Sequence, residues 1–246
     1  MAADGKIFSA SLLLIAGLLL GELPANAGSE AQQIKLGQYV FHVPQKLFAS
    51  QPYSYSVVML DNKSVDNPRQ TQLEANELII GMGGITALGL NDGVAIPPAR
   101  SSSFVRWGDT HHVPYQIRLS DGAALGDWSK RVPLGVEQNR KMVEAAASLD
   151  PDANGFVRVN RNFLVYKGSN YQTATGDALV VMLPPEAKAN GPSFDIGMIS
   201  TALQKDFFLF YLFATRDSSS VGLWEMHQHV VSCVERLLQP ANDSGC

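Results

Sequence analysis

The sequence predicts an α+β fold with a mostly antiparallel sheet, and three observations lead to this prediction. Most of the chain from Ile34 onward consists of short apolar or β-branched runs bounded by turn-forming residues, which is typical of strands. Only two segments have helical spacing of apolar residues, a middle helix at about 135–149 and an amphipathic C-terminal helix at about 222–239. These helices do not alternate with the strands, so the sequence does not favour a parallel sheet of βαβ units.

The first 27 residues have the pattern of a cleaved secretory signal peptide. Lys6 precedes a continuous apolar run, residues 7–21, and the small residues Ala25 and Ala27 form an A-x-A cleavage site. The run is shorter than the roughly 20 residues of a membrane-spanning helix, so cleavage is favoured over an uncleaved anchor. We therefore expect a periplasmic or secreted protein whose mature chain, residues 28–246, is a single α+β domain.

The charge of the chain excludes two classes of partner. Removal of Asp4, Lys6 and Glu22 with the signal peptide changes the formal net charge from −4 to −3. A mildly acidic chain without a block of Lys and Arg lacks the basic surface that binds nucleic acid or anionic lipid. We expect no nucleic-acid binding and no membrane insertion after cleavage. Another protein is the expected partner, and the sequence does not indicate an oligomeric state.

The first strands follow from apolar runs between turn signals. The run 34–44 alternates loosely and ends at Pro44, and the run 53–60 is rich in β-branched and aromatic residues. The segment 76–90 is apolar but broken by glycines, which we expect to permit a bulge or a turn. Its "GMGGIT" falls short of a dinucleotide-binding fingerprint, because Thr86 stands where the third glycine is needed.

The later strands surround the middle helix. We expect "SFVRW" and "VPYQIRL" to form a strand pair around "GDTHH". Strands resume after the helix with "FVRVNRNFLVY" and "DALVVMLP". The run "DFFLFYLFAT" is too short to cross a membrane and very rich in aromatic residues, so it predicts a central buried strand.

The two helices are predicted from their apolar positions. In the middle helix, Val136, Val143 and Ala147 recur near helical spacing among good helix formers. In the C-terminal helix, Ser220 is expected to cap the start, and Pro240 prevents much extension. The apolar residues of this helix fall on one arc of a helical wheel, which predicts packing against a sheet. They are Leu223, Trp224, Met226, Val230, Val231, Cys233, Val234, Leu237 and Leu238.

The only two cysteines, Cys233 and Cys246, lie near the C-terminus. In an oxidising compartment they predict one disulfide that holds the tail to the last helix. The alternative is a pair of free thiols, because a terminal cysteine can be too mobile for disulfide geometry. Neither cysteine has the neighbours of a catalytic thiolate.

The stretch "LDPDANGFVRVNR" contains a calcium candidate, formed by Asp150, Asp152 and Asn154. These residues occupy the first three ligand positions of an EF-hand loop, and the next residue is the required glycine. Arg158 and Arg161 stand at the ninth and twelfth positions, where ligands are needed, so half of the expected charge is missing.

A calcium site would need a carboxylate from elsewhere, and Asp177, Glu186 and Asp195 are the available donors. The favoured alternative is a helix end followed by a turn, in which Asp and Asn side chains accept hydrogen bonds from backbone N–H groups. On this interpretation the protein needs no cofactor.

The histidines give one further candidate site. His111 and His112 lie next to Asp109, with Asp121 and Asp127 downstream, but adjacent strand residues point to opposite faces and no zinc motif is present. His227 lies on the apolar arc of the C-terminal helix, and it is expected to be a hydrogen-bonded core residue, like His42.

Three functions remain open, and a non-catalytic role is favoured because no catalytic motif is present. The first is an exported binding or inhibitor protein, of which an immunity-type protein that neutralises a toxin is one form. The second is an exported hydrolase whose site assembles around His111 or His112 and Asp109. The third is a structural or assembly component of a cell-envelope complex, which an exposed apolar patch or a bare sheet edge would favour.

Overall fold

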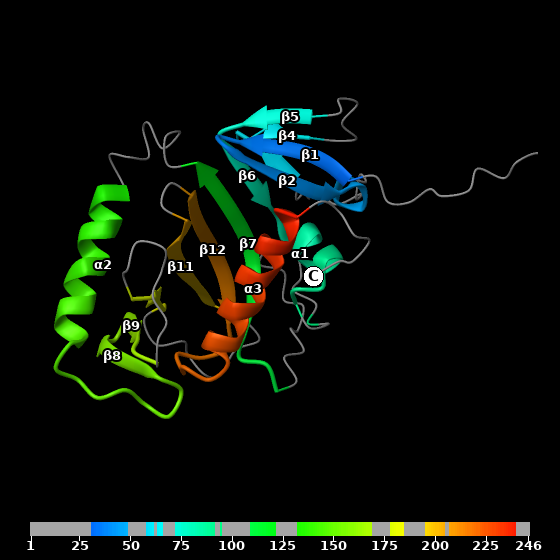
Figure 1. Ribbon diagram of the computed structural model, residues 1–246. Coiled ribbons are helices and arrows are strands. Elements are labelled where there is room, and N and C mark those ends of the chain that lie inside the picture. Colours follow the sequence, from blue (N-terminus) through cyan, green and yellow to red (C-terminus); the bar gives the residue numbers. More distant parts are fainter. Residues whose placement is uncertain are drawn as a thin grey trace, which may run out of the picture.

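The computed structural model describes residues 31–48, 58–61, 63–65, 72–91, 94, 109–121, 132–168, 178–184, 195–204 and 207–239. These residues form an α+β fold around one large antiparallel sheet, which confirms the predicted fold class (Figure 1). The predicted signal peptide, "SFVRW" and Cys246 lie outside the described residues. The disulfide and the cleavage site therefore stay predictions.

The large sheet has nine strands, and all pairings between them are antiparallel. In spatial order they are β4 (Lys63–Ser64), β3 (Val58–Leu60), β6 (Glu77–Ile80), β7 (His112–Asp121), β12 (Phe207–Thr215), β11 (Asp195–Gln204), β10 (Val180–Met182), β9 (Phe163–Tyr166) and β8 (Phe156–Asn160). The run "DFFLFYLFAT" supplies β12 in the middle of this order, so its prediction as a central strand is confirmed.

A second sheet of three strands follows the order β2 (Tyr39–Pro44), β1 (Ala31–Leu36) and β5 (Gln72–Ala75). The strand expected over 34–44 is in fact a hairpin, since β1 and β2 pair antiparallel around a turn at Gly37. Gly37 has φ +57°, and a Cβ there would meet the carboxylate of Asp121, so any other residue would be strained and would displace that side chain. The pairing of β1 with β5 is parallel.

The helices differ in detail from the prediction. α2 (Val132–Ala146) begins and ends about three residues before the expected middle helix, and α3 (Leu223–Leu237) matches the C-terminal one closely. The run 76–90 was expected to be a glycine-broken strand, but only β6 is extended and α1 (Met82–Leu88) follows at once. A short 3₁₀ helix, η1 (Gln45–Phe48), follows β2. None of the described helices has both the length and the apolar composition to cross a membrane.

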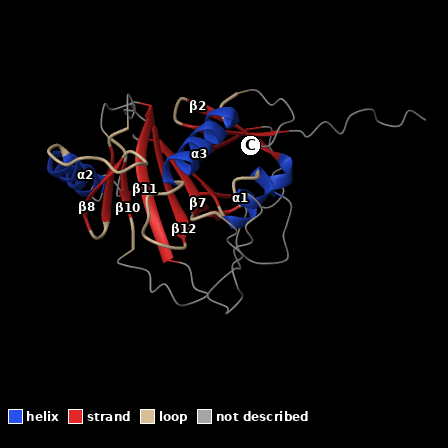
Figure 2. Cartoon of the chain, turned by 90° about the horizontal axis from the view of Figure 1, so that it is seen from below, coloured by secondary structure: helices blue, strands red, loops and turns tan. Residues whose placement is uncertain are grey.

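α2 covers one face of the large sheet, and α3 and the small sheet cover the other (Figures 1 and 2). Val157, Val165 and Val180 lie side by side on β8, β9 and β10, and they pack against α2. The alternate residues of the same strands point to the other face, where α3 and the small sheet enclose the main core. β12 contributes four fully buried side chains to this core, namely Phe207, Leu209, Tyr211 and Phe213.

The apolar arc predicted for α3 is confirmed. Its buried residues are Leu223, Met226, His227, Val230, Cys233, Val234 and Leu237. The predicted cap is wrong, because Gly222 precedes the helix with φ 74° and no side chain caps it. Trp224 stacks on Tyr166 of β9 with ring centroids 4.1 Å apart, so the start of α3 is fixed against the β8–β9 hairpin.

The C-terminal end of α2 is stabilised by Lys167, the residue that follows β9. Lys167 Nζ donates hydrogen bonds to the carbonyl oxygens of Ala146, Ala147 and Leu149. These carbonyls have no partner within the helix, and a cation is stabilised at a helix C-terminus by the helix dipole. The chain can leave the helix at Ala146 because Lys167 replaces the helical hydrogen bonds, and Ala147, an expected core position, is exposed.

Both edges of the large sheet are short. β4 has two residues, and β8 has five with an irregular register between Arg158 and Asn160. Short strands, irregular pairing and charged residues are the usual protection of a sheet edge against pairing with another chain. Among the described residues, neither edge of the large sheet is a long, regular strand.

We predict that Lys167→Met lowers the free energy of unfolding by about 1 kcal/mol, because the last carbonyls of α2 lose their donor. Urea denaturation measures this change. Lys63→Met is the matched control, since Lys63 is exposed on β4 and makes no side-chain hydrogen bond to a described residue. An equal effect of the two substitutions would contradict the capping role.

Candidate functional site

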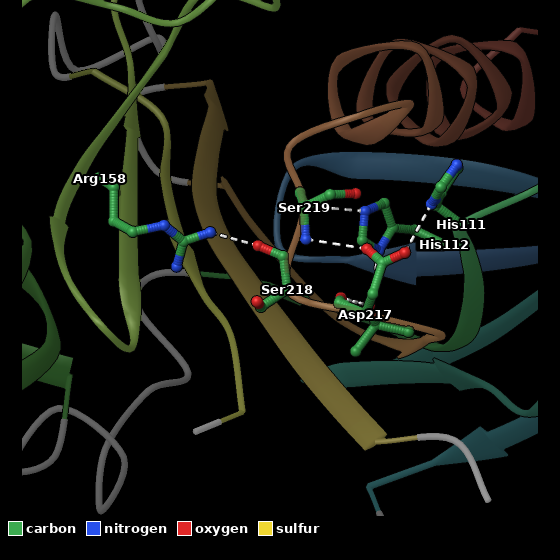
Figure 3. A network of polar contacts seen from close by, with 7 residues as sticks. His111, His112, Arg158, Asp217, Ser218 and Ser219 are labelled. Atoms are coloured by element: carbon green, nitrogen blue, oxygen red, sulfur yellow. Dashed lines mark hydrogen bonds and ion pairs between the residues drawn. The ribbon is translucent and has the colours of Figure 1, made fainter. Parts of the chain in front are cut away.

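The candidate site is the loop of residues 216–222 that joins β12 to α3, called here the β12–α3 loop. The register of β7 and β12 places His112 directly opposite Thr215, at the point where the loop begins. Side chains from β7, from the start of β8 and from the loop itself then meet around the loop backbone (Figure 3). The loop is partly exposed, apart from the buried Ser220.

A histidine and a carboxylate pair at this site. His111 Nδ1 lies 2.8 Å from Asp217 Oδ2, and the two side chains are 29% and 39% exposed. The carboxylate oxygen accepts, so Nδ1 carries the proton and donates. Nε2 of His111 points away from Asp217 and makes no hydrogen bond to a described residue (Figure 3). Asp217 therefore fixes the orientation of the His111 ring and leaves its Nε2 open.

Asp217 is held as an anion. Burial raises the pKa of its carboxyl, but hydrogen bonds from Ser219 and His111 outweigh this cost and lower the pKa to about 2. One of these bonds is donated by the backbone N–H of Ser219 to Oδ1 over 2.9 Å. The carboxylate fixes the loop conformation as well as the orientation of His111.

His112 is buried below the same loop, with 4% of its surface exposed. Its Nδ1 lies 2.8 Å from Thr215 Oγ1, and its Nε2 lies 3.1 Å from the carbonyl oxygen of Ser219. The edge of the ring faces Phe213, with centroids 5.6 Å apart at 90°. Burial lowers the pKa of His112 to about 4, against the opposing effect of Asp217.

The loop is also fixed from the β8 side. Arg158 Nη2 donates to the carbonyl oxygen of Ser218. The hydroxyl of Ser220 donates to Asp152 Oδ2 and accepts a hydrogen bond of 3.0 Å from Asn154 Nδ2. The turn before β8 and the β12–α3 loop therefore share one polar junction.

The contacts of this junction account for the side chains of Asp152 and Asn154, two of the three calcium-ligand candidates. Asp152 Oδ1 accepts hydrogen bonds from the backbone N–H groups of Asn154 and Phe156, at 2.9 and 3.0 Å, and Oδ2 accepts from Ser220. These are the turn contacts of the favoured alternative. Asp150 is exposed and makes no hydrogen bond to a described residue.

A metal site is not assembled in the described part of the chain, where no group of three His, Cys, Asp or Glu side chains is arranged to hold an ion. Of the additional carboxylates, Asp177 and Glu186 lie outside the described residues, and Asp195 lies at the start of β11. Calcium binding stays the untested, less favoured candidate for this turn.

The other histidine expectations have mixed outcomes. Asp109 is exposed without a hydrogen bond to a described residue, and Asp217 takes the place expected for it beside His111. His227 is a hydrogen-bonded core residue, as expected, since its Nδ1 lies 3.0 Å from Tyr211 Oη and the ring is fully buried. His42 is only partly buried, because Phe41 and Val43 take the inward positions of β2.

Sequence reasoning missed Thr215, Asp217 and Ser219, which complete the site. The segment "DSSSVG" was considered only for Ser220, as the cap of the C-terminal helix, and nothing local links it to "THH". One signal could have pointed to Asp217. The aromatic run before it predicts a central strand, and a central strand must have another strand on each side, whose residues would lie near Asp217. Which strand lies beside it cannot be derived from either segment alone.

No family model matches this chain, and no curated protein or solved structure matches it either. A function must therefore be inferred from the geometry of the site itself.

The buried histidines predict acid sensitivity. Burial lowers the pKa of His227 from 6.5 to about 4, so the unfolded chain binds its proton first as the pH falls. Stability from this group is complete above pH 6.5, declines below it, and is lost by about pH 4. The full difference is about 3 kcal/mol.

We expect the double variant Tyr211→Phe, His227→Phe to lose about 3 kcal/mol less stability between pH 7 and pH 4 than the wild type, while the contribution of His112 remains. Replacing both partners avoids an unsatisfied hydroxyl. Urea unfolding over this pH range is the measurement, and His229→Gln, on the same helix and partly exposed, is the control. An unchanged pH dependence in the double variant would show that His227 is not a buried neutral ring.

Asp152 is expected to stabilise the turn without bound calcium. EDTA should leave the melting temperature almost unchanged, and Asp152→Ala should cost about 2 kcal/mol with or without the metal, because three hydrogen bonds to a carboxylate are lost. Asp150→Ala, in the same turn, should have an effect within about 0.5 kcal/mol. A calcium-dependent rise of several degrees that Asp152→Ala abolishes would instead establish the metal site.

Proposed function

We propose that this protein is an exported, non-catalytic binding or inhibitor protein, and that the β12–α3 loop is its contact surface. Its partner is another protein. In the most specific form it is an immunity-type protein that neutralises a toxin in the periplasm or outside the cell. The predicted signal peptide, the single-domain length and the mildly acidic charge all fit this proposal.

The observation that carries the proposal is the fixed backbone of a partly exposed loop. Three successive carbonyl oxygens, those of Asp217, Ser218 and Ser219, lie within hydrogen-bond distance of Thr215, Arg158 and His112, respectively, and the backbone N–H of Ser219 donates to Asp217. A loop that is ordered before binding loses little conformational entropy when a partner binds, so more of the contact energy appears as affinity.

The loop also offers an apolar contact. Val221 is 44% exposed at the end of the loop, directly after Ser220, which is tied to Asp152. A single exposed apolar residue is common on protein surfaces, and its place on a fixed loop is what suggests a contact residue. The rigid scaffold of β12 and α3 supports the loop on both sides.

The test is affinity capture of partners from cell-envelope and secreted fractions by the purified protein. Val221→Asp should weaken capture at least tenfold, because the partner would have to desolvate a charge in the contact. Ile196→Asp is the matched control, since Ile196 is 45% exposed on β11, on the sheet face away from α3. Equal capture by both variants would contradict the role of the loop.

A second candidate is an exported hydrolase, and the specific observation in its favour is the His111–Asp217 pair. A carboxylate that orients a histidine, whose second nitrogen is open, is the arrangement of a general base. Among the described residues no serine hydroxyl is hydrogen-bonded to His111. Turnover of ester, peptide or glycan substrates that is lost in His111→Gln, without a captured partner, would favour this candidate.

A further inference from the structure

The side chain of His112 lies between two oxygen atoms, each within hydrogen-bond distance of one ring nitrogen. On one side is the carbonyl oxygen of Ser219, 3.1 Å from Nε2, which can only accept. On the other side is Thr215 Oγ1, 2.8 Å from Nδ1. The single hydroxyl proton of Thr215 is directed to the carbonyl oxygen of Asp217.

Counting the protons shows that a neutral ring cannot make all three hydrogen bonds. If Nε2 donates to Ser219, the bare Nδ1 needs the proton of Thr215, and the Asp217 carbonyl loses its donor. If Nδ1 carries the proton instead, the bare Nε2 faces the Ser219 carbonyl. Only the doubly protonated imidazolium, which has two N–H donors, satisfies His112, Thr215, Asp217 and Ser219 together.

The geometry points to a pH switch in which protonation of His112 completes the hydrogen bonds that fix the β12–α3 loop. The protein then holds its partner more tightly in acid than at neutral pH. This inference rests on the proposed function, because the loop is the proposed contact surface. An exported protein meets the pH of its surroundings directly, which gives such a switch a signal to respond to.

The charged surroundings allow the switch to operate. The titratable groups that act on His112 in the described part of the chain are Asp217, which favours the imidazolium, and His111, which opposes it. Burial is the largest effect and lowers the pKa to about 4, so the ring is neutral at pH 7 and gains its proton in acid. Asp217 remains ionised throughout this range, because its own pKa is about 2.

The first measurement uses the ring of the wild-type protein. NMR correlation of the ring nitrogens with their carbon-bound protons identifies the protonation state of each histidine between pH 7 and pH 3.5. We expect His112 to change from one protonated nitrogen to two while the protein is still folded. Protonation of His112 only upon unfolding would overturn the proposal.

The second measurement is amide hydrogen exchange, corrected for the intrinsic pH dependence of exchange. The N–H of Ser219 donates to Asp217 Oδ1, and the N–H of Arg216 donates to the carbonyl oxygen of His111 over 2.9 Å. Protection of these two amides should rise on the order of five-fold in acid, the effect of one added hydrogen bond. Unchanged protection would overturn the switch.

Thr215→Val removes the shared hydroxyl and should abolish the acid-dependent gain in protection. The matched control is Thr201→Val, because Thr201 is also buried in the sheet, and its hydroxyl has no hydrogen-bond partner among the described residues. A gain that persists in Thr215→Val would contradict the switch. If Thr215→Val does not fold, the ring and amide measurements on the wild-type protein still test whether protonation of His112 fixes the loop.

An experiment with the captured partner separates the pH switch from the proposed function. A partner captured at pH 7 should be retained at least three-fold better at pH 3.5 by the wild type, but not by Thr215→Val. Retention that is independent of pH, with Val221→Asp still defective, overturns the switch alone. Capture that is unaffected by Val221→Asp overturns the proposed function, whatever the histidine does.

Discussion

The pairing of β7 with β12 is the constraint on which the rest of the structure depends. It runs in register from Asp121 opposite Phe207 to His112 opposite Thr215, with one irregularity near Leu212. This register turns alternate residues of β12 toward α3 and the small sheet, which produces the main core. The same register brings the two histidines to the start of the β12–α3 loop. A shift of one residue would reverse both arrangements at once.

The polar junction around the loop is more consistent with fixing a backbone than with chemistry. Most of its hydrogen bonds end on backbone groups, such as the carbonyls of Ser218 and Ser219 and the amide of Ser219. Catalytic groups instead converge on a point where a reacting atom can sit, and only His111 directs a free nitrogen outward. A fixed, partly exposed loop is what a binding protein needs, because its contact surface must be ordered before the partner arrives.

The parts of the fold that the sequence predicts are those with a local physical cause. The apolar arc of α3 has a period that only a helix satisfies, and "DFFLFYLFAT" is too apolar for any place but the middle of a sheet. The hairpin at Gly37 was missed although a turn glycine marks it, because the runs on either side were treated as one strand. The end of α2 could not be predicted locally, since the donor is Lys167, on the far side of a hairpin.

The candidate site was only half predictable for the same reason. His111 and His112 stand out because histidines are rare here, and Asp152 was correctly placed in a turn. The carboxylate that pairs with His111 is 106 residues away in the chain, beyond any spacing rule. Asp109 was expected instead because it is close in sequence. Closeness in the sequence does not show which side chains pair in space, whereas the register between neighbouring strands does.

Backbone ¹⁵N relaxation over residues 216–222 is the most direct test of the idea that the β12–α3 loop is fixed before it meets a partner. Order parameters near about 0.85, equal to those of β7 and β12, are the result that a preordered loop predicts. Values below about 0.6 would mean that the loop is mobile on the picosecond-to-nanosecond timescale. The loop would then not be a preordered contact surface, and the proposed function would lose its main support.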